Sequence, residues 1–138
     1  MRDTALLAIR PEIATEATTT NGAETFQNQT LRPVLKLQND LLLSLFGHYL
    51  VKRKQLGPDA RFAKMSQAEQ DAYIDHTIRT DLKFRNLLVG TIIGQFTADE
   101  WTIFLADESE LTRRLGHLLT QRIQDQRGTF AVSVIQLV

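Results

Sequence analysis

The chain has 138 residues, with 16 basic residues balanced by 16 acidic ones and no cysteine. This length fits one domain with a single hydrophobic core, so stability requires no disulfide or metal. The zero formal charge gives no reason to expect nucleic acid or an anionic membrane as a partner, and it favours self-association. The lack of cysteine excludes disulfides, thiol nucleophiles and zinc-thiolate sites, and it is compatible with a reducing compartment.

The N-terminal stretch MRDTALLAIRPEI contains an apolar run that is too short for a signal-peptide core. No segment approaches the roughly twenty apolar residues of a membrane span, so we expect a soluble cytoplasmic protein without a membrane partner. Residues 14–25 are small and polar, contain an Asn-Gly turn signal and lack a hydrophobic period. We interpret residues 1–25 as a flexible or extended lead and residues 26–127 as a helical bundle domain.

The first long helix is expected from Thr30 to about Leu56. Thr30 is a good N-cap, and Pro33 is tolerated in the first turn because its missing N–H costs nothing there. Apolar residues cover most of the circumference of this helix, which predicts a central helix surrounded by neighbours. Gly57 and Pro58 would end it.

A second helical region is predicted to begin at Ser66, whose side chain can cap the helix while Glu69 reaches back to the cap amide. Its apolar period continues to Phe96. Around residues 79–83, RTDLK, the region either bends or breaks into two helices, and Thr80 could cap the second one. The sequence leaves both alternatives open.

The stretch QFTADEWTIFLADESELTRRL predicts a corner between helices. Thr97 and Glu100 have the spacing of a capping box, and Phe96 and Trp101 that of a hydrophobic staple. These residues predict a short helix over ADEWTIFLA.

A second capping box is predicted at Asp107 and Glu110, and the last long helix would follow it. The acids of these first turns favour the positive end of a helix dipole, so we assign them to capping rather than to metal binding or acid/base chemistry. They are Asp99, Glu100, Glu108 and Glu110. The last helix is expected to bury one stripe of apolar residues and to end at Gly128. The stripe consists of Leu111, Leu115, Leu118, Leu119 and Ile123.

The segment TFAVSVIQLV that follows is β-branched and apolar, with no charge. We interpret residues 128–138 as an apolar arm. It could pair with the N-terminal TALLAIRP, pack as an extended arm, or add to another subunit, because an exposed strand edge promotes aggregation. We favour a homodimer formed through this arm. The residues proposed for self-association are Phe130, Val132, Val134, Ile135 and Leu137.

Four residues form the best candidate ligand pocket: His48, Asp81, Arg85 and Asn86. Arg85 falls within the apolar stripe of its helix, and Asp81, one turn earlier, is positioned to pair with it. His48 shares a helical direction with leucines, which favours a hydrogen-bonded interior histidine. Asn86 could complete the pocket.

The remaining polar residues offer little chemistry. His76 and His117 have polar neighbours and are expected to be solvated. Asp71 and Asp75 could share a metal, although such a pair is more often a solvated face. No pair of histidines has metal-ligand spacing on a helix, and no phosphate loop or nucleophile elbow is present. We therefore predict no catalytic residue, no metal and no cofactor.

Three stretches carry a resemblance to a known group: TFQNQTLRPVLKLQNDLLLSLFGHYL, KFRNLLVGTIIGQFTADEW and the leucine-rich last helix. Over residues 26 to about 126 the chain resembles an uncharacterised family of small helical bacterial proteins, some of which carry a glyoxalase label. Glyoxalases use paired βαβββ modules and Glu/His metal ligands, neither of which this sequence contains. The resemblance therefore implies a helical fold and no functional residue.

Together these patterns predict an all-α fold, a bundle of four to five helices around a central hydrophobic helix, with the N-terminal lead and the C-terminal arm outside it. We expect a non-catalytic interaction or scaffold protein that acts as a homo-oligomer, with a further protein as a possible partner. The alternative is a helical bundle that binds a small molecule or metal, possibly as an enzyme, in a polar pocket near Arg85.

If the arm mediates self-association, a chain that ends at Gln126 is expected to lose it, because the apolar contact surface is removed. Native mass spectrometry of the two chains would measure this. An unchanged number of subunits after truncation contradicts the hypothesis.

Overall fold

Helices make up the regular structure of the residues described by this computed structural model, which are 1–13, 21–55 and 61–130. The predicted all-α class is confirmed, and the described residues contain no strand. In chain order the elements are α1 (Arg2–Ile9), α2 (Gly22–Phe26), the π-helical turn η1 (Gln27–Leu31), α3 (Arg32–Leu37), α4 (Asn39–Lys52), α5 (Arg61–Lys64), α6 (Gln67–Thr80), α7 (Leu82–Ile93), α8 (Ala98–Ala106) and α9 (Glu108–Asp125). None of these helices has the length and apolar character required to cross a membrane.

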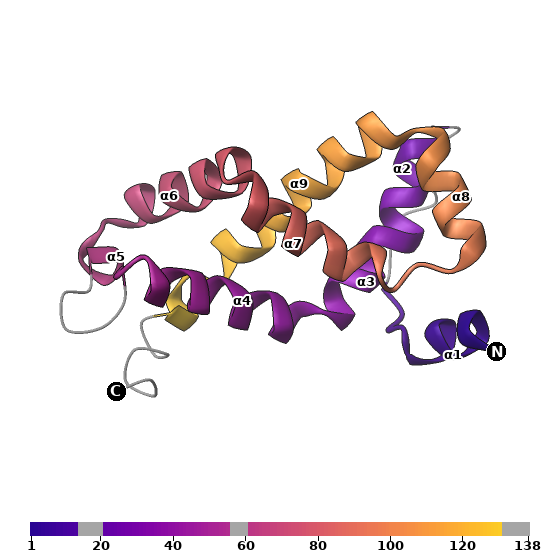
Figure 1. The fold of residues 1–138 in the computed structure, drawn as a ribbon, viewed down its shortest axis with the longest axis horizontal. Helices are drawn as coiled ribbons and strands as arrows, with labels where there is room; N and C mark the ends of the chain where they lie inside the picture. Colours follow the sequence, from indigo (N-terminus) through magenta and orange to yellow (C-terminus); the bar gives the residue numbers. More distant parts are fainter. Residues whose placement is uncertain (14–20, 56–60, 131–138) are drawn as a thin grey trace.

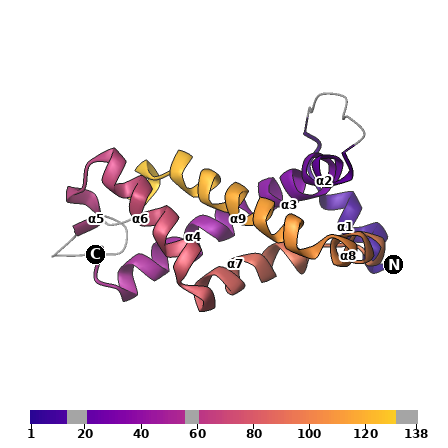
Figure 2. The same ribbon diagram turned by 90° about the horizontal axis from the view of Figure 1, so that it is seen from above.

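The long helices pack side by side, with α1, α2 and α8 at one end of the molecule and α5 at the other (Figures 1 and 2). Helix α9 contacts α4, α6, α7, α8 and η1. Helices α4 and α7 are antiparallel neighbours: the Tyr49 ring near the end of α4 meets Phe84 near the start of α7. At the opposite end, the Gln38 amide before α4 donates to the Thr91 carbonyl oxygen of α7 at 3.0 Å.

The predicted single helix from Thr30 to Leu56 is wrong, because η1 and a kink at Gln38 divide it. Pro33 explains the first irregularity. It has no N–H for the carbonyl one turn earlier, and its ring crowds that carbonyl, so a wider π-turn relieves both problems. Thr30 lies inside η1 and is not an N-cap. The proposed stop at Gly57 and Pro58 lies outside the described residues.

Helix α4 is buried on one face and open on the other, so it is not surrounded as the sequence predicted. Leu42, Phe46 and Leu50 are fully buried, whereas Leu41 and His48 are exposed. The core that α4 faces consists of aliphatic and phenyl side chains from α2 through α9. Its open face matters for the candidate site described below.

The region between Ser66 and Phe96 forms two helices, α6 and α7. The capping box at Ser66 and Glu69 is confirmed, with both reciprocal hydrogen bonds present. Asp81, rather than Thr80, caps α7, and its carboxylate accepts a hydrogen bond from the Phe84 amide at 3.1 Å. The Thr80 hydroxyl instead donates to the His76 carbonyl within α6, so it cannot serve the next helix.

The corner before α8 has the predicted capping box of Thr97 and Glu100. The staple differs from the prediction. Phe96 packs its ring against Phe26 and Phe104, while Trp101 stacks on Phe104 and stays partly exposed.

The second predicted capping box is wrong. The Asp107 side chain makes no cap hydrogen bond to α9. Glu110 instead accepts hydrogen bonds from Arg113 and Arg114, and these bonds lower the pKa of its carboxyl to about 2. The Glu110 carboxylate therefore binds two arginines of the next turn and not the backbone amide of Asp107.

Helix α9 buries the predicted stripe, including Leu111, Leu115 and Ile123. It ends at Asp125, before the expected stop at Gly128. Phe130 then returns to the core, 1% exposed, with its ring against Phe46 and Phe62.

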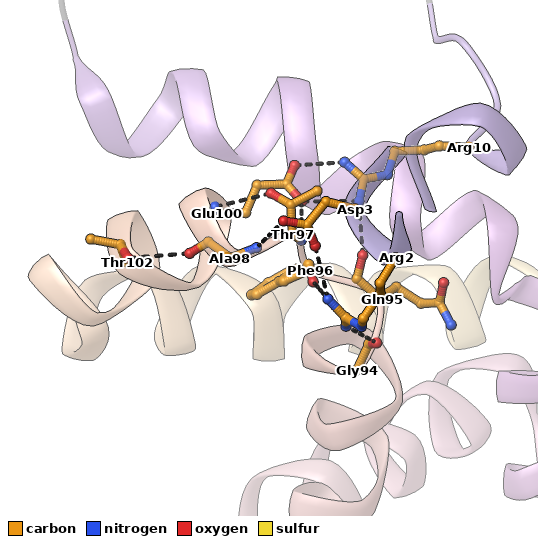
Figure 3. A network of polar contacts seen from close by, with 10 residues as sticks. All are labelled: Arg2, Asp3, Arg10, Gly94, Gln95, Phe96, Thr97, Ala98, Glu100 and Thr102. Atoms are coloured by element: carbon orange, nitrogen blue, oxygen red, sulfur yellow. Dashed lines mark hydrogen bonds and ion pairs between the residues drawn. The ribbon is translucent and has the colours of Figure 1, made fainter. Parts of the chain in front are cut away.

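The N-terminal lead differs from a flexible or extended segment, because residues 2–9 form α1 and residues 22–26 form α2. Helix α1 contains no buried residue, and polar contacts hold it in place (Figure 3). Arg2 donates to the carbonyl oxygens of Phe96 at 2.9 Å and Gly94 at 3.1 Å. Asp3 accepts a hydrogen bond from the Ala98 amide at 3.1 Å, at the start of α8. Since TALLAI is helical here, pairing of this segment with the C-terminal arm as a strand is excluded in this fold.

Arg10 completes this attachment through a two-pronged ion pair with Glu100, whose distances are 2.6 and 3.0 Å. The two side chains are only 7% and 13% exposed. Arg10 also donates to the Gln95 carbonyl, and the Thr30 hydroxyl donates to Glu100 at 3.0 Å. Burial alone would raise the pKa of Glu100, but the bonds from Arg10, the Thr97 amide and Thr30 outweigh burial and hold it below its ordinary value.

Replacing Glu100 with Gln is expected to lower the free energy of unfolding at neutral pH by about 3 kcal/mol, because Arg10 would remain buried without its counter-charge. A group whose folded pKa is depressed stabilises the fold above its unfolded pKa and loses that contribution on acidification. The wild type should therefore lose more stability than Glu100→Gln as the pH falls below the ordinary value of 4.5. Chemical denaturation at several pH values measures both effects.

The matched control is Asp99→Asn, a neighbouring exposed acid in the same turn of α8. It removes the same charge without unpairing a buried group. Equal destabilisation by the two variants would contradict a special role for the ion pair.

Candidate functional site

A groove of about 780 Å³ lies between α4 and α7. Its walls come from the second half of α4, the cap of α7 and the first turns of α7. The lining residues are Leu45, His48, Tyr49, Lys52, Arg53, Asp81, Lys83, Phe84, Asn86 and Leu87. Apolar side chains provide most of its floor, and basic side chains stand along its rim.

The floor is built on aromatic rings. The ring centroids of Tyr49 and Phe84 are 4.4 Å apart, and Phe46 lies beneath both of them at 6.1 and 5.9 Å. Phe46 and Phe84 belong to the hydrophobic core, which fixes their positions. Leu45 and Leu87 extend the apolar surface on the two helices. The floor is therefore a continuation of the core that remains open to a ligand.

Asp81 organises the polar end of the groove. Besides capping α7, its carboxylate accepts hydrogen bonds from the Tyr49 hydroxyl at 2.8 Å and from Arg53 at 3.2 Å. The Arg53 guanidinium also lies 5.2 Å from the centre of the Tyr49 ring, as in a cation–π contact. The Phe84 amide, followed by Tyr49 and Arg53, holds the pKa of Asp81 below its usual value.

The pKa of Tyr49, in contrast, is raised. Burial raises the pKa of the Tyr49 hydroxyl, and its hydrogen bond to Asp81 raises it further, against a smaller lowering by Arg53. At neutral pH the hydroxyl stays protonated and donates to a charged carboxylate. This end of the groove is thus a fixed polar anchor.

Basic residues dominate the rim. Lys52, Lys83 and the exposed face of Arg53 surround the apolar floor, together with His48. The only acid in the lining is Asp81, and three donors already bind it. Within the described residues, the groove therefore presents more positive than negative charge to a ligand.

The four predicted pocket residues are divided between two faces of α7. His48, Asp81 and Asn86 line the groove, whereas Arg85 reaches to α9 on another side. The predicted Asp81–Arg85 pair is wrong, because Asp81 as the helix cap turns toward Tyr49 and Arg53. The predicted interior position of His48 is also wrong: it is exposed, since α4 lacks a neighbour on this face.

Sequence reasoning missed Tyr49, Lys83, Phe84 and Leu87. A partial signal exists, because Leu45, Tyr49 and Lys52 recur at helical spacing, as do Lys83 and Leu87. The antiparallel contact that brings these two stripes together depends on tertiary packing, which this spacing does not encode.

Metal ligation finds no support in this geometry. Among the residues with described positions, no three histidine or carboxylate side chains form a group that could hold an ion. Asp71 binds Arg127 at 3.1 Å and Asp75 lies 3.5 Å from Arg79, so the two acids do not share a site. His76 and His117 are exposed, as predicted.

Of the residues proposed for self-association, Phe130 lies in the core of its own chain. Val132, Val134, Ile135 and Leu137 lie outside the described residues, and dimerisation through the arm stays a prediction. A chain that ends at Phe130 is now a better test than one that ends at Gln126, because it keeps this core ring.

No family model, no curated protein and no solved structure matches the chain. The resemblance to a family of small helical bacterial proteins therefore stays a prediction. The candidate site has to be interpreted from its own geometry.

Replacing Asp81 with Asn is expected to lower the pKa of Tyr49 toward its ordinary value of 10.0, because both the charge and the charged acceptor disappear. Asn is also a good N-cap, so α7 should remain intact. In a Tyr73→Phe background, Tyr49 is the only tyrosine, and its ionisation can be followed by ultraviolet difference absorbance. Asp75→Asn is the control, as an exposed acid without a bond to Tyr49. An unchanged titration in Asp81→Asn would contradict the anchor.

Proposed function

We propose that the chain is a non-catalytic interaction protein whose α4–α7 groove binds an acidic amphipathic helix of a partner protein. The observation that carries this proposal is the combination of an open aromatic and aliphatic floor with a basic rim. Helix-in-groove recognition uses this combination, with apolar anchors for affinity and flanking charges for orientation.

The dimensions of the groove suit a helix. Helix α7 has 12 residues, and at 1.5 Å per residue its wall is about 18 Å long, or roughly three helical turns. On α4, exposed Leu41 precedes Leu45 by one turn and continues the apolar stripe. On α7, exposed Gly90 follows Leu87, and a Cβ there would meet no atom within 4 Å. Beyond the lining residues, α4 thus offers one more exposed apolar side chain and α7 one unobstructed position.

Two leucines in this region are largely exposed. Leu87 is 50% exposed and Leu41 is 45% exposed. Apolar side chains from one face of a partner helix would cover them and remove their surface from water. The lining residues come from successive turns of two antiparallel helices, and such paired apolar stripes match the apolar face of a third helix.

The positive charge of the rim favours a partner helix with negatively charged flanks. Lys52 and Lys83 come from opposite walls, and Arg53 lies at the anchored end. Glutamate or aspartate on the two flanks of a partner helix would meet these groups and align its apolar face with the floor. Such complementary charge raises the association rate and selects against basic helices.

The pKa directions at the anchored end favour binding over catalysis. A carboxylate is a more efficient general base when its pKa is raised, and a tyrosine is a better nucleophile or acid when its pKa is lowered. Asp81 and Tyr49 have the opposite directions. Their contact stabilises one arrangement instead of moving a proton.

The test uses a synthetic amphipathic peptide of about 15 residues, with leucines at i, i+3, i+4 and i+7 and glutamates on both flanks. We expect it to bind the full chain, and Leu87→Asp and Lys83→Glu each to weaken binding at least about tenfold. Fluorescence anisotropy gives the affinity, and amide chemical-shift changes in α4 and α7 give the location.

Matched controls are Leu105→Asp and Lys36→Glu, which make the same changes on α8 and α3. Leu105 is 48% exposed, close to the value for Leu87. Equal binding of a peptide with lysines in place of glutamates would contradict the charge argument. A fatty acid that binds the groove when the peptide does not, or a dimer of this chain that Leu87→Asp dissociates, would replace the proposed partner.

A further inference from the structure

A separate cavity of about 510 Å³ lies among α6, α7 and α9, and Arg85 is the only α7 residue in its lining. Its other polar side chains include Arg79 of α6 and Ser109, Thr112 and Arg113 of α9. This cavity shares no lining residue with the α4–α7 groove. A ligand here would be independent of the partner helix proposed above.

Arg85 reaches across the cavity to the backbone of α9 at Gly116. A Cβ added to Gly116 would lie 3.2 Å from Nη2 of Arg85, so the guanidinium occupies the space that a side chain would need. Gly116 itself is buried and Arg85 is partly buried. Because Gly116 has no Cβ, the guanidinium can lie against the backbone of α9 at this position.

No described residue forms a hydrogen bond or ion pair with the guanidinium of Arg85. Asp81, the acid one turn earlier, is bound to Tyr49 and Arg53 on the other side. The other two arginines in the lining are committed: Arg79 lies 3.5 Å from Asp75, and Arg113 lies 2.6 Å from Glu110. Arg85 therefore brings a guanidinium without a direct ion-pair partner, and its fork of N–H donors, to the cavity.

A guanidinium in such a position matches the geometry of phosphate, which it can bind through two parallel hydrogen bonds. The start of α9 adds the positive end of a helix dipole next to Ser109 and Thr112. Partial burial of Arg85 strengthens these interactions compared with those of a solvated side chain. The Arg85 side of the cavity is therefore suited to a phosphate group.

The volume and the remaining polar groups define the rest of the ligand. About 510 Å³ is typical of small-molecule sites. The carboxylates of Asp75 and Glu108 also line the cavity, and they would accept hydrogen bonds from hydroxyl groups while repelling further anionic groups. We propose that this cavity binds a small phosphate monoester that carries hydroxyl groups, such as a phosphorylated sugar, with Arg85 on the phosphate.

The test titrates the full-length protein with ribose 5-phosphate, inorganic phosphate and ribose at constant ionic strength. Calorimetry gives the affinity, and the Nε–Hε signal of Arg85 gives the location. We expect ribose 5-phosphate to bind more tightly than phosphate, ribose to bind much more weakly than either, and Arg85→Gln to weaken binding at least about tenfold.

A second variant, Gly116→Ala, tests the geometry without removing the charge. Alanine suits a helix better than glycine, so α9 should persist, but the new methyl group would displace the guanidinium. We expect binding between that of the wild type and that of Arg85→Gln. The control is Arg61→Gln, an exposed arginine of α5, which should bind like the wild type.

Absence of binding to wild-type protein would overturn the proposal. So would equal affinity of the wild type and Arg85→Gln, or an equal loss in Arg61→Gln, which would indicate a general effect of charge. Equal affinity for ribose and ribose 5-phosphate would remove the phosphate from the argument. None of these outcomes depends on whether the α4–α7 groove binds a helix.

Discussion

One buried carboxylate determines how the chain enters its last two helices. Glu100 accepts hydrogen bonds from Arg10, Thr30 and the Thr97 amide, and so joins segments that are 90 and 70 residues apart with the cap of its own helix. Because a single residue separates α8 from α9, the direction of α8 also determines where α9 begins. Helix α9 then contacts α4, α6 and α7. The ion pair is costly to desolvate, but its two hydrogen bonds of 2.6 and 3.0 Å attach Arg10 directly to the first turn of α8.

Helix α7 contributes residues to both candidate sites, but no residue lines both of them. Successive residues of a helix point about 100° apart, so Phe84 and Leu87 can face α4 while Arg85 faces α9. Asp81 makes this division possible. As a cap it ends α6, starts α7 and turns its charge toward Tyr49, which leaves Arg85 without the partner that a simple helical spacing would give it. The break between α6 and α7 therefore leaves an apolar groove on one side of α7 and the cavity that contains Arg85 on another.

The sequence predicted correctly several features that depend on residues close together in the chain. The capping boxes at Ser66 and Thr97 and the stripe of α9 depend on neighbours within a turn or two, and the structure confirms them. It was insufficient where two groups compete for one side chain and where the partner lies far along the chain. The Glu110 carboxylate does not reach back to the Asp107 amide because it binds Arg113 and Arg114, and the pairing predicted for Asp81 was wrong because Asp81 binds Tyr49, 32 residues away. The open face of α4 was missed for the same reason, since a helix apolar on most sides does not reveal which side lacks a neighbour.

The π-helical turn η1 also determines in which direction the side chains of the preceding helix α2 point about the helix axis. A π-turn holds one more residue than an α-turn, so residues 27–31 shift everything N-terminal to them by roughly 100° relative to a regular helix. That shift places the Phe26 ring against Phe96 and Phe104 while Thr30 faces Glu100. Removing the exposed Gln29 would delete no buried side chain but would rotate Phe26 away from these rings. The number of residues in this turn is therefore under stronger constraint than the identity of its exposed member, Gln29.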